Sequence, residues 1–304
     1  MSKAVGIHTG AHTMSVPDAI LQAVAQGGGK ITLVVGAGCS LEDPTSIPLA
    51  TTCSEECHEQ LVANGVLAQG DCGLPGNLSS LADAVFQKTG GKQGPLVQQL
   101  SQRYSLKTAT PNEGHEIAAA LLFEGVISSV VTLNFDLALS IAIGALGAGE
   151  SVGIIEGPDD MLKQQTCNLY YLHRNANADP EDWVLRTAAI GQDWKDRWDA
   201  ALVPKAMATP IVLFVGMGSP ADVLVESARH IRAVMPKGSV AYQVDPGASG
   251  ASAFSQALSL AAGSHIQAKW CTFMNTVGQR HVDEQAIRVR TAAADLVRQN
   301  RLGT

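Results

Sequence analysis

Short runs of β-branched and other apolar residues alternate along the chain with stretches in which apolar residues recur at helical spacing. Strands separated by helices of these lengths form parallel βαβ units, whose sheet is covered by helices on both faces. The sequence therefore predicts an α/β fold with a Rossmann-like, doubly wound parallel sheet. We expect strands at 30–35, 126–133, 152–155, 169–172, 211–215, 240–244 and 266–272. We expect helices at 16–25, 54–64, 78–88, 95–104, 116–124, 221–234, 251–262 and 284–299.

A long segment after the first strand carries no convincing strand pattern. Residues from about 41 to 110 instead resemble several helices, separated by turns that contain Gly or Pro. We expect a helical insertion there, lying over the carboxyl ends of the strands, where open α/β sheets bind ligands. No internal repeat, low-complexity tract or linker divides the sequence, so we expect one domain over residues 1–304 that ends in a helix at 284–304.

Composition limits the partners and the location of the chain. Lys and Arg number 21 against 28 Asp and Glu, a formal net charge of −7, whereas phosphate contact demands a basic face. We therefore expect no direct nucleic-acid binding, with a local basic patch or a basic partner subunit as the alternative. The N-terminus lacks the apolar core of a signal peptide, and no apolar run approaches the roughly 20 residues that span a bilayer. With six scattered cysteines, these features predict a cytoplasmic protein with reduced thiols and no membrane contact.

The first candidate for a binding site is the glycine turn that directly follows the first expected strand. Gly36, Ala37, Gly38 and Ser40 stand where glycine lets the backbone approach the phosphates of a ligand. Leu41 occupies the position at which the dinucleotide fingerprint G-x-G-x-x-G carries its third small residue, so the motif is incomplete. A tight turn without a ligand is the alternative.

Polar residues also follow two later strands. Thr132, Asn134 and Asp136 alternate at the end of the second strand, so the amide and the carboxylate can both point into the ligand crevice. Burying two polar groups costs free energy, which favours a functional role over a simple helix cap. His173 follows another strand, where an imidazole is suited to general-base catalysis near neutral pH or has a structural role.

Three further segments carry weaker signals. Residues 111–115 (PNEGH) open a helix, for which Pro and Asn supply a turn and a cap. Gly216, Gly218 and Ser219 form a second glycine turn after the strand at 211–215. Asp245 ends the next strand, where its carboxylate is placed to meet a ribose hydroxyl. For the second glycine turn and for Asp245, the alternative is that these residues only form a turn.

The order of these motifs resembles the sirtuin (Sir2) superfamily. The resemblance covers about residues 31 to 245 and rests on GAG-x-S, PN-x-x-H, T-x-N-x-D, a strand-end histidine and G-x-G-S, in that order. The matching residues outside the second glycine turn are Gly36, Ala37, Gly38, Cys39, Ser40, Ile47, Pro48, Pro111, Asn112, His115, Thr132, Asn134, Asp136, Leu172 and His173.

The resemblance implies that NAD is bound as a substrate. The glycine loop with Ser40 would receive NAD, Asn134 would hold the nicotinamide ribose or position a water, and Asp136 would lie near the carboxamide. His173 would be the catalytic base. The other residues assigned to NAD are Thr132, Asp245, and Gly216, Gly218 and Ser219 on the adenosine side.

The chain departs from the family in its cysteines. Sirtuin deacylases carry a structural zinc bound by two cysteine pairs downstream of the catalytic histidine, whereas only Cys271 follows His173 here. We therefore expect no zinc and no other metal. Cys53 and Cys57, beside His58, have a different spacing and are interpreted as paired thiols on a helix surface rather than as a metal site.

Two more departures lie next to the expected catalytic residues. Leu133 stands where deacylases carry Gln, and Arg174 stands where the histidine is usually followed by Gly. Arg174 puts the loop conformation in question, because Arg disfavours positive φ.

The missing zinc module and the retained Asn and His resemble the sirtuin-like NAD hydrolases of bacterial anti-phage systems, which deplete NAD during infection. The resemblance implies cleavage of the nicotinamide–ribose bond to nicotinamide and ADP-ribose. A zinc-free deacylase or ADP-ribosyltransferase, and an inactive NAD or ADP-ribose sensor, are the alternatives. Because an unregulated NAD hydrolase would be harmful, we expect control by assembly as a homo-oligomer or with a partner, for which the resemblance offers a hexameric translocase ATPase.

Overall fold

The fold is built around one parallel sheet. The computed structural model describes residues 15–192, 198–217, 222–248, 250 and 252–302. In this part of the chain seven strands form one sheet in the order β3-β4-β2-β1-β5-β6-β7, with every neighbouring pair parallel. The predicted doubly wound parallel sheet is thereby confirmed. The strands are β1 (Ile31–Val35), β2 (Ile127–Thr132), β3 (Val152–Ile155), β4 (Cys167–Tyr171), β5 (Ile211–Val215), β6 (Val240–Val244) and β7 (His265–Ile266).

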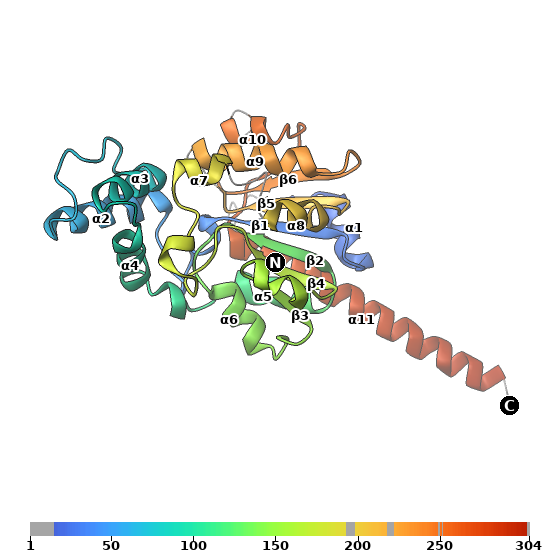
Figure 1. Cartoon of the computed structure of the whole chain (residues 1–304). Coiled ribbons are helices and arrows are strands. Elements are labelled where there is room, and N and C mark those ends of the chain that lie inside the picture. The colour runs from blue at the N-terminus through green and yellow to red at the C-terminus, as the bar shows by residue number, and fades with distance from the viewer. Residues whose placement is uncertain (1–14, 193–197, 218–221, 249, 251, 303–304) are drawn as a thin grey trace, which may run out of the picture.

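Helices cover both faces of the sheet, and a further group lies to one side of it (Figure 1). One face packs against α1 (Asp18–Gln26), α5 (Glu113–Phe123), α6 (Ala138–Ala145) and α11 (Trp270–Leu302). The other packs against α8 (Trp198–Ala206), α9 (Asp222–Val234) and α10 (Ala253–Ala257). The side group contains α2 (Ala50–Ala63), α3 (Leu78–Lys88) and α4 (Gly94–Arg103), and α7 (Thr187–Gln192) contacts α3 and α9. Short 3-10 turns are η1 (Ala37–Cys39), η2 (Leu106–Thr108), η3 (Pro158–Lys163) and η4 (Pro180–Asp182).

The central strand shows how the sequence produces two cores. Successive side chains of a strand point to opposite faces of the sheet, so β1 contributes to both. Leu33 and Val35 join the core that contains residues of α1, α5 and α11, whereas Val34 joins the core that contains residues of α8, α9 and α10. Burial on both faces is the reason that this strand has a continuous apolar sequence rather than an alternating one.

The strand order reverses direction at β1, whose neighbours are β2 on one side and β5 on the other. The turns that follow β1 and β5 lie against each other. The Gly36 amide donates to the Val215 carbonyl at 2.9 Å, and the Gly38 amide donates to the Gly216 carbonyl at 2.9 Å. A Cβ on Gly38 would lie 2.9 Å from the Gly216 Cα, so side chains are excluded from this contact. Ligands of open α/β sheets bind at such a switch point.

The helices of the side group occupy the segment between β1 and β2 in which the sequence predicts an insertion. They stand beyond the carboxyl ends of the strands and lie close to one another (Figure 1). This segment contributes side chains to the large core cluster, among them Leu61, Leu81 and Leu96. The insertion is therefore packed onto the rest of the protein rather than joined by a loose tether.

The C-terminal region differs from its prediction. A strand was expected at 266–272, but β7 ends at Ile266 and the long helix α11 already begins at Trp270. The apolar residues of this segment, including Phe273 and Met274, pack at helical spacing against α5 rather than as a strand. Within the described residues, no helix is both long and apolar enough to cross a bilayer.

Three helices of the structure were not predicted: the six-residue α7, and α6 and α8. The sequence of α6 is apolar almost throughout, so it has no polar face from which a helical period could be recognised. Helix α8 carries Pro204 in its interior, and an internal proline argues against a helix in a sequence pattern. Both helices are stabilised by packing onto the sheet, which overrides weak local signals.

The glycine contact predicts a large effect of Gly216→Ala. Gly216 has φ +67°, and an added Cβ would lie 2.6 Å from the Cys39 amide nitrogen, so the backbone itself would have to move. Gly147 is the matched control, because it also has φ +67° but has no atom within 4 Å of an added Cβ. We expect Gly147→Ala to lower the free energy of unfolding by about 1 kcal/mol. We expect Gly216→Ala to lower it by about 1–3 kcal/mol more. Equal losses in urea denaturation would contradict the close contact.

Candidate active site

A cavity of about 970 Å³ opens at the carboxyl ends of the central strands. Its walls come from the turns after β1, β2, β4, β5 and β6, from the insertion and from the first residues of α11. Polar groups that are far apart in the sequence therefore meet around one space. The lining includes these predicted site residues: Gly36, Ala37, Gly38, Ser40, Asn134, Asp136, His173, Gly216 and Asp245.

Three of these residues form a connected polar group. The Ser40 hydroxyl donates to Asp136 Oδ2 at 2.8 Å. The Asn134 amide nitrogen donates to the Ser40 hydroxyl at 3.2 Å and to the Gly36 carbonyl at 3.1 Å. The group thus ties the turn after β2 to the glycine turn after β1. The structure thus brings the ends of β1 and β2 together.

Asp136 is a carboxyl group in a dry environment. Burial raises its pKa, while the hydrogen bonds from Ser40 and from the Ala138 backbone amide act in the opposite direction. Its side chain is directed at the cavity but has little contact with solvent. A carboxylate held in this way has oxygen lone pairs left for a donor on a bound ligand.

Thr132 lies beneath the cavity rather than on its wall. The side chain is buried, and its hydroxyl accepts a hydrogen bond from the Asn134 backbone amide at 3.1 Å. This contact sets the direction in which the chain leaves β2 and therefore the position of the Asn134 side chain. Thr132 is accordingly placed to support the site rather than to line it.

His173 reaches the cavity from the end of β4. Its carbonyl accepts from the Val184 amide at 3.2 Å, which closes the loop that follows the histidine. Phe135 lies near its ring, with a centroid distance of 6.3 Å, and Phe135 in turn stacks on Trp183 at 4.4 Å. The imidazole therefore lies beside an aromatic pair and lines the same cavity as Asn134 and Asp136.

The loop after His173 is fixed to the insertion by a second set of hydrogen bonds. The Glu181 carboxylate accepts from the backbone amides of Gln93 and Gly94 at the start of α4, at 2.9 Å each. The buried Gln93 side chain donates back to the carbonyls of Pro180 and Trp183, at 2.8 Å each. These residues were not predicted, because nothing in the sequence relates segments separated by almost 90 positions.

Arg174 adopts the backbone conformation that glycine would supply. Its φ is +67°, so the substitution of Arg for Gly does not prevent the left-handed turn. The guanidinium donates to the Glu156 carbonyl at 2.8 Å, and the neighbouring Asn175 amide donates to the Glu156 carboxylate at 2.6 Å. These contacts with the loop after β3 offset the cost of the turn.

Substitutions at Arg174 separate the backbone requirement from the side-chain contacts. Arg174→Gly and Arg174→Val both remove the guanidinium, but only glycine adopts positive φ without strain. We expect Arg174→Gly to stay within about 1 kcal/mol of the parent in free energy of unfolding and Arg174→Val to lose at least about 2 kcal/mol. Urea denaturation measures both, and equal stability of the two variants would show that the turn imposes no such requirement.

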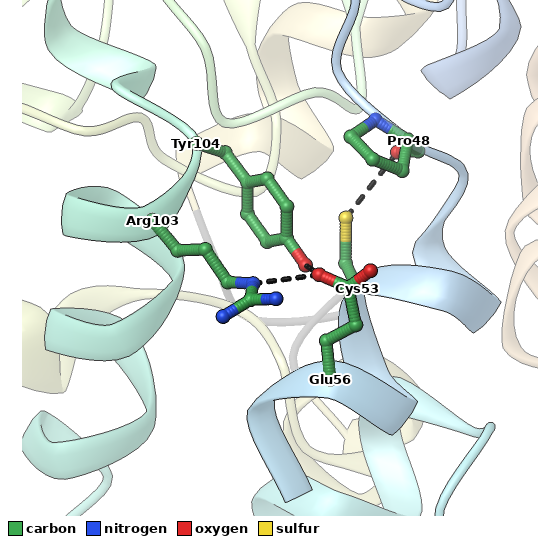
Figure 2. Close-up of polar contacts among 5 residues, drawn as sticks. All are labelled: Pro48, Cys53, Glu56, Arg103 and Tyr104. Carbon is green, nitrogen blue, oxygen red and sulfur yellow. Dashed lines mark hydrogen bonds and ion pairs between the residues drawn. The ribbon is translucent and has the colours of Figure 1, made fainter. Parts of the chain in front are cut away.

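The insertion side of the cavity includes residues of α2, α3 and α4, and Figure 2 shows the polar contacts between α2 and the end of α4. The Glu56 carboxylate accepts from the Tyr104 hydroxyl at 2.8 Å and from Arg103 Nε at 2.6 Å, which joins the two helices. Cys53 lines the cavity, and its thiol donates to the Pro48 carbonyl at 3.3 Å. Burial raises the pKa of Cys53 to about 11, so the thiol stays protonated.

The prediction of surface thiols on this helix is wrong. Cys53 and Cys57 are both buried, because the helix face that carries them packs into the core. All six cysteines lie within the described residues and are free thiols. Among the described residues, no group of three or more His, Cys, Asp or Glu is placed to hold a metal ion.

The segment at 111–115 begins α5 as predicted. Asn112 and His115 form a capping box, in which the Asn112 side chain accepts from the His115 amide and His115 Nδ1 accepts from the Asn112 amide. Asn112 also donates to the Cys39 carbonyl at 2.9 Å and accepts from Trp270 Nε1 at 3.1 Å. One buried amide thus connects the glycine turn, α5 and the start of α11.

His115 predicts a specific loss of stability in acid. Burial lowers its pKa from 6.5 to about 4, so the unfolded chain binds a proton there before the folded protein does. The folded state is therefore progressively destabilised as the pH falls from 6.5 to about 4, by up to about 3 kcal/mol. His115→Gln keeps a capping-box side chain that does not titrate. The difference in unfolding free energy between the two proteins should change over this range, and a constant difference would contradict the neutral buried histidine.

The far side of the cavity is formed by the ends of β5 and β6. Gly216 and Asp245 lie on its wall, together with Met217 and Pro246. The Asp245 carboxylate accepts from the Gly247 amide at 2.8 Å. This hydrogen bond stabilises the turn after β6, which is the alternative role expected for Asp245. Gly218 and Ser219 lie outside the described residues.

Comparisons with known proteins identify the fold. No protein-family model matches the chain, and no curated protein sequence is detectably similar to it. Solved structures of Sir2 homologues do match. A serine-to-alanine variant in complex with ADP-ribose has TM-score 0.55 and 13% identity, over 89% of this chain and 98% of that one. A histidine-to-asparagine variant, also with ADP-ribose, has TM-score 0.53 and 12% identity, over 89% and 98%. The chain therefore has a sirtuin-like fold, as its motif order predicts.

Proposed function

We propose that this protein binds NAD and hydrolyses its nicotinamide–ribose bond, which releases nicotinamide and ADP-ribose. The observation that carries the proposal is the meeting, in one cavity, of the hydrogen-bonded Ser40, Asn134 and Asp136 with the His173 imidazole. The solved Sir2 homologues with ADP-ribose support it, since they share the fold and hold one of the expected products.

The residues fit a dinucleotide. Gly36, Ala37 and Gly38 line the cavity, and glycine at two of these three positions lets the backbone lie close to a bound diphosphate. The cavity of about 970 Å³ is large enough for a ligand of this size. Asp245 at the end of β6 offers a carboxylate for a ribose hydroxyl, as acidic residues do in other dinucleotide sites.

The chemistry requires three tasks of the chain. Cleavage passes through an oxocarbenium-like state, in which the bond from ribose to the nicotinamide nitrogen breaks and its electron pair neutralises the ring. The Asp136 carboxylate would accept the carboxamide N–H groups and so orient the leaving group. Asn134 would orient the ribose and the attacking water. His173 would accept the proton that the water loses as its oxygen bonds to the ribose carbon.

A second candidate is a zinc-free deacylase or ADP-ribosyltransferase, in which another nucleophile replaces the water. The insertion side of the cavity favours it, because Leu49, Leu78, Leu100 and Leu106 give that wall an apolar character suited to an acyl group. An inactive sensor of NAD or ADP-ribose is the third candidate. A loop distorted by Arg174 would favour it, but Arg174 adopts the left-handed turn and His173 still lines the cavity.

One experiment separates the three candidates. The purified protein is incubated with NAD, with and without an acetyl-lysine peptide, and nicotinamide is measured. We expect release without peptide. Release only with peptide would identify a transferase or deacylase, and NAD binding without turnover would identify a sensor.

Variants test the assigned residues in the same assay. We expect Asn134→Ala and His173→Ala each to lower nicotinamide release by at least about 100-fold, because positioning and proton transfer contribute at this level. Asn64→Ala, which removes an exposed amide distant from the cavity lining, is the control and should release nicotinamide normally. Circular dichroism and urea denaturation establish that the variants fold. Normal turnover in both site variants would overturn the assignment.

We further propose a setting for this activity. Depletion of NAD in anti-phage defence fits an enzyme that needs no second substrate, and such an enzyme requires control by self-association or by a partner such as a hexameric translocase ATPase. A cytoplasmic location and the use of no zinc belong to the same proposal. A monomer that is fully active alone would contradict control by assembly.

A further inference from the structure

Helix α11 extends well beyond the body of the protein (Figure 1). It spans 33 residues, which corresponds to a length of about 50 Å. Its first half packs on α1 and α5, and Arg288 donates a hydrogen bond to the Ala25 carbonyl at the end of α1. The segment after Arg288 projects away from the sheet, and all of its side chains from Val289 to Arg298 are exposed.

A heptad pattern runs along α11 from the part that packs on α1 into the exposed part. Val282, Val289 and Leu296 recur every seven residues, and Ala286 and Ala293 fall between them, so the spacing runs four, three, four, three. Such spacing places all five side chains in one stripe along the helix, as at the a and d positions of a coiled coil. The three large side chains are 59%, 68% and 62% exposed. A stripe of this kind is characteristic of a helix that packs against another helix.

We propose that the α11 stripe binds α11 of a second copy of this chain, as an antiparallel two-stranded coiled coil. The flanking charges indicate both the partner and the direction. Asp283 and Arg290 each follow a valine of the stripe and therefore occupy the same flanking position of the heptad, e. In an antiparallel pair, position e of one helix faces position e of the other. Asp283 of each copy then faces Arg290 of the other, which makes two symmetric ion pairs.

A parallel pair lacks this complementarity. Position e would there face position g of the other helix, which is occupied by Gly278, Gln285 and Ala292. None of these residues pairs with Asp283 or Arg290. The antiparallel arrangement also sets the alanines of one stripe against the valines of the other, so that small residues meet large ones. The same patch on both copies forms the interface, as twofold symmetry requires.

Sedimentation velocity of the full-length chain tests the proposal across a concentration series. We expect wild-type protein to sediment at an even multiple of the 31.7 kDa chain mass. Val289→Glu places a charge in the stripe and should halve the number of copies in the assembly. Thr291→Glu is the matched control, because it places the same charge on the opposite face of the same helix and should leave the assembly intact.

A charge exchange tests the direction of the pairing. Asp283→Arg and Arg290→Asp each set like charges against one another, so each should raise the dissociation constant at least tenfold. The double variant restores opposite charges and should return the dissociation constant to within a few-fold of the parent. A wild-type monomer, an assembly that Val289→Glu leaves unchanged, or a double variant as weak as the single variants would each overturn the proposal. Nicotinamide release plays no part in these readouts, so the outcome is independent of the proposed function.

Discussion

The backbone contact between the turns after β1 and β5 is the constraint on which the site depends. Gly38 and Gly216 meet so closely that neither position has space for a Cβ. This contact is made where the strand order reverses, so it also determines where the sheet opens towards a ligand. Through Asn134 and Ser40, the turn after β2 is fastened to the same place. A molecule bound in the cavity would therefore meet both the backbone of the glycine turn and these polar side chains.

The polar side chains of the cavity are held by contacts between residues that are far apart in the sequence. Asp136 is desolvated yet retains hydrogen bonds, a combination that keeps a carboxyl group available to a specific donor. His173 is held through Phe135 and Trp183, and its loop is fastened to α4 by Gln93 and Glu181. The insertion therefore also positions the site, because the residues at the start of α4 fix the loop that follows His173.

The sequence was sufficient to predict the sheet, and to place most of the candidate site residues at one cavity, for one physical reason. In a parallel sheet all carboxyl ends lie at one edge, so polar residues that follow buried strands must gather there. Asn134 and His173 could be assigned to one cavity on this basis. Helices α6 and α8 were missed because one lacks a polar face and the other contains Pro204. The start of α11 was missed because a short apolar segment fits a strand as well as a buried helix.

The contacts that could not be predicted are those made by single long-range partners. Neither the Gln93–Glu181 pairing nor the contact of Trp270 with Asn112 has a local signal, since each depends on the tertiary arrangement. At Arg174 the local preference was misleading. Arg disfavours positive φ, yet Arg174 adopts it, because its guanidinium donates to the Glu156 carbonyl. Local rules therefore describe the strand ends well and the loops that fasten them poorly.

The central claim is that a dinucleotide binds where the glycine turns meet and that Asn134 and His173 face its ribose. A crystal structure of the protein with ADP-ribose tests this claim most directly. We expect the diphosphate beside the backbone of Gly36 and Gly38, with the ribose between the two side chains. ADP-ribose bound at another place, or Asn134 and His173 turned away from it, would contradict the claim.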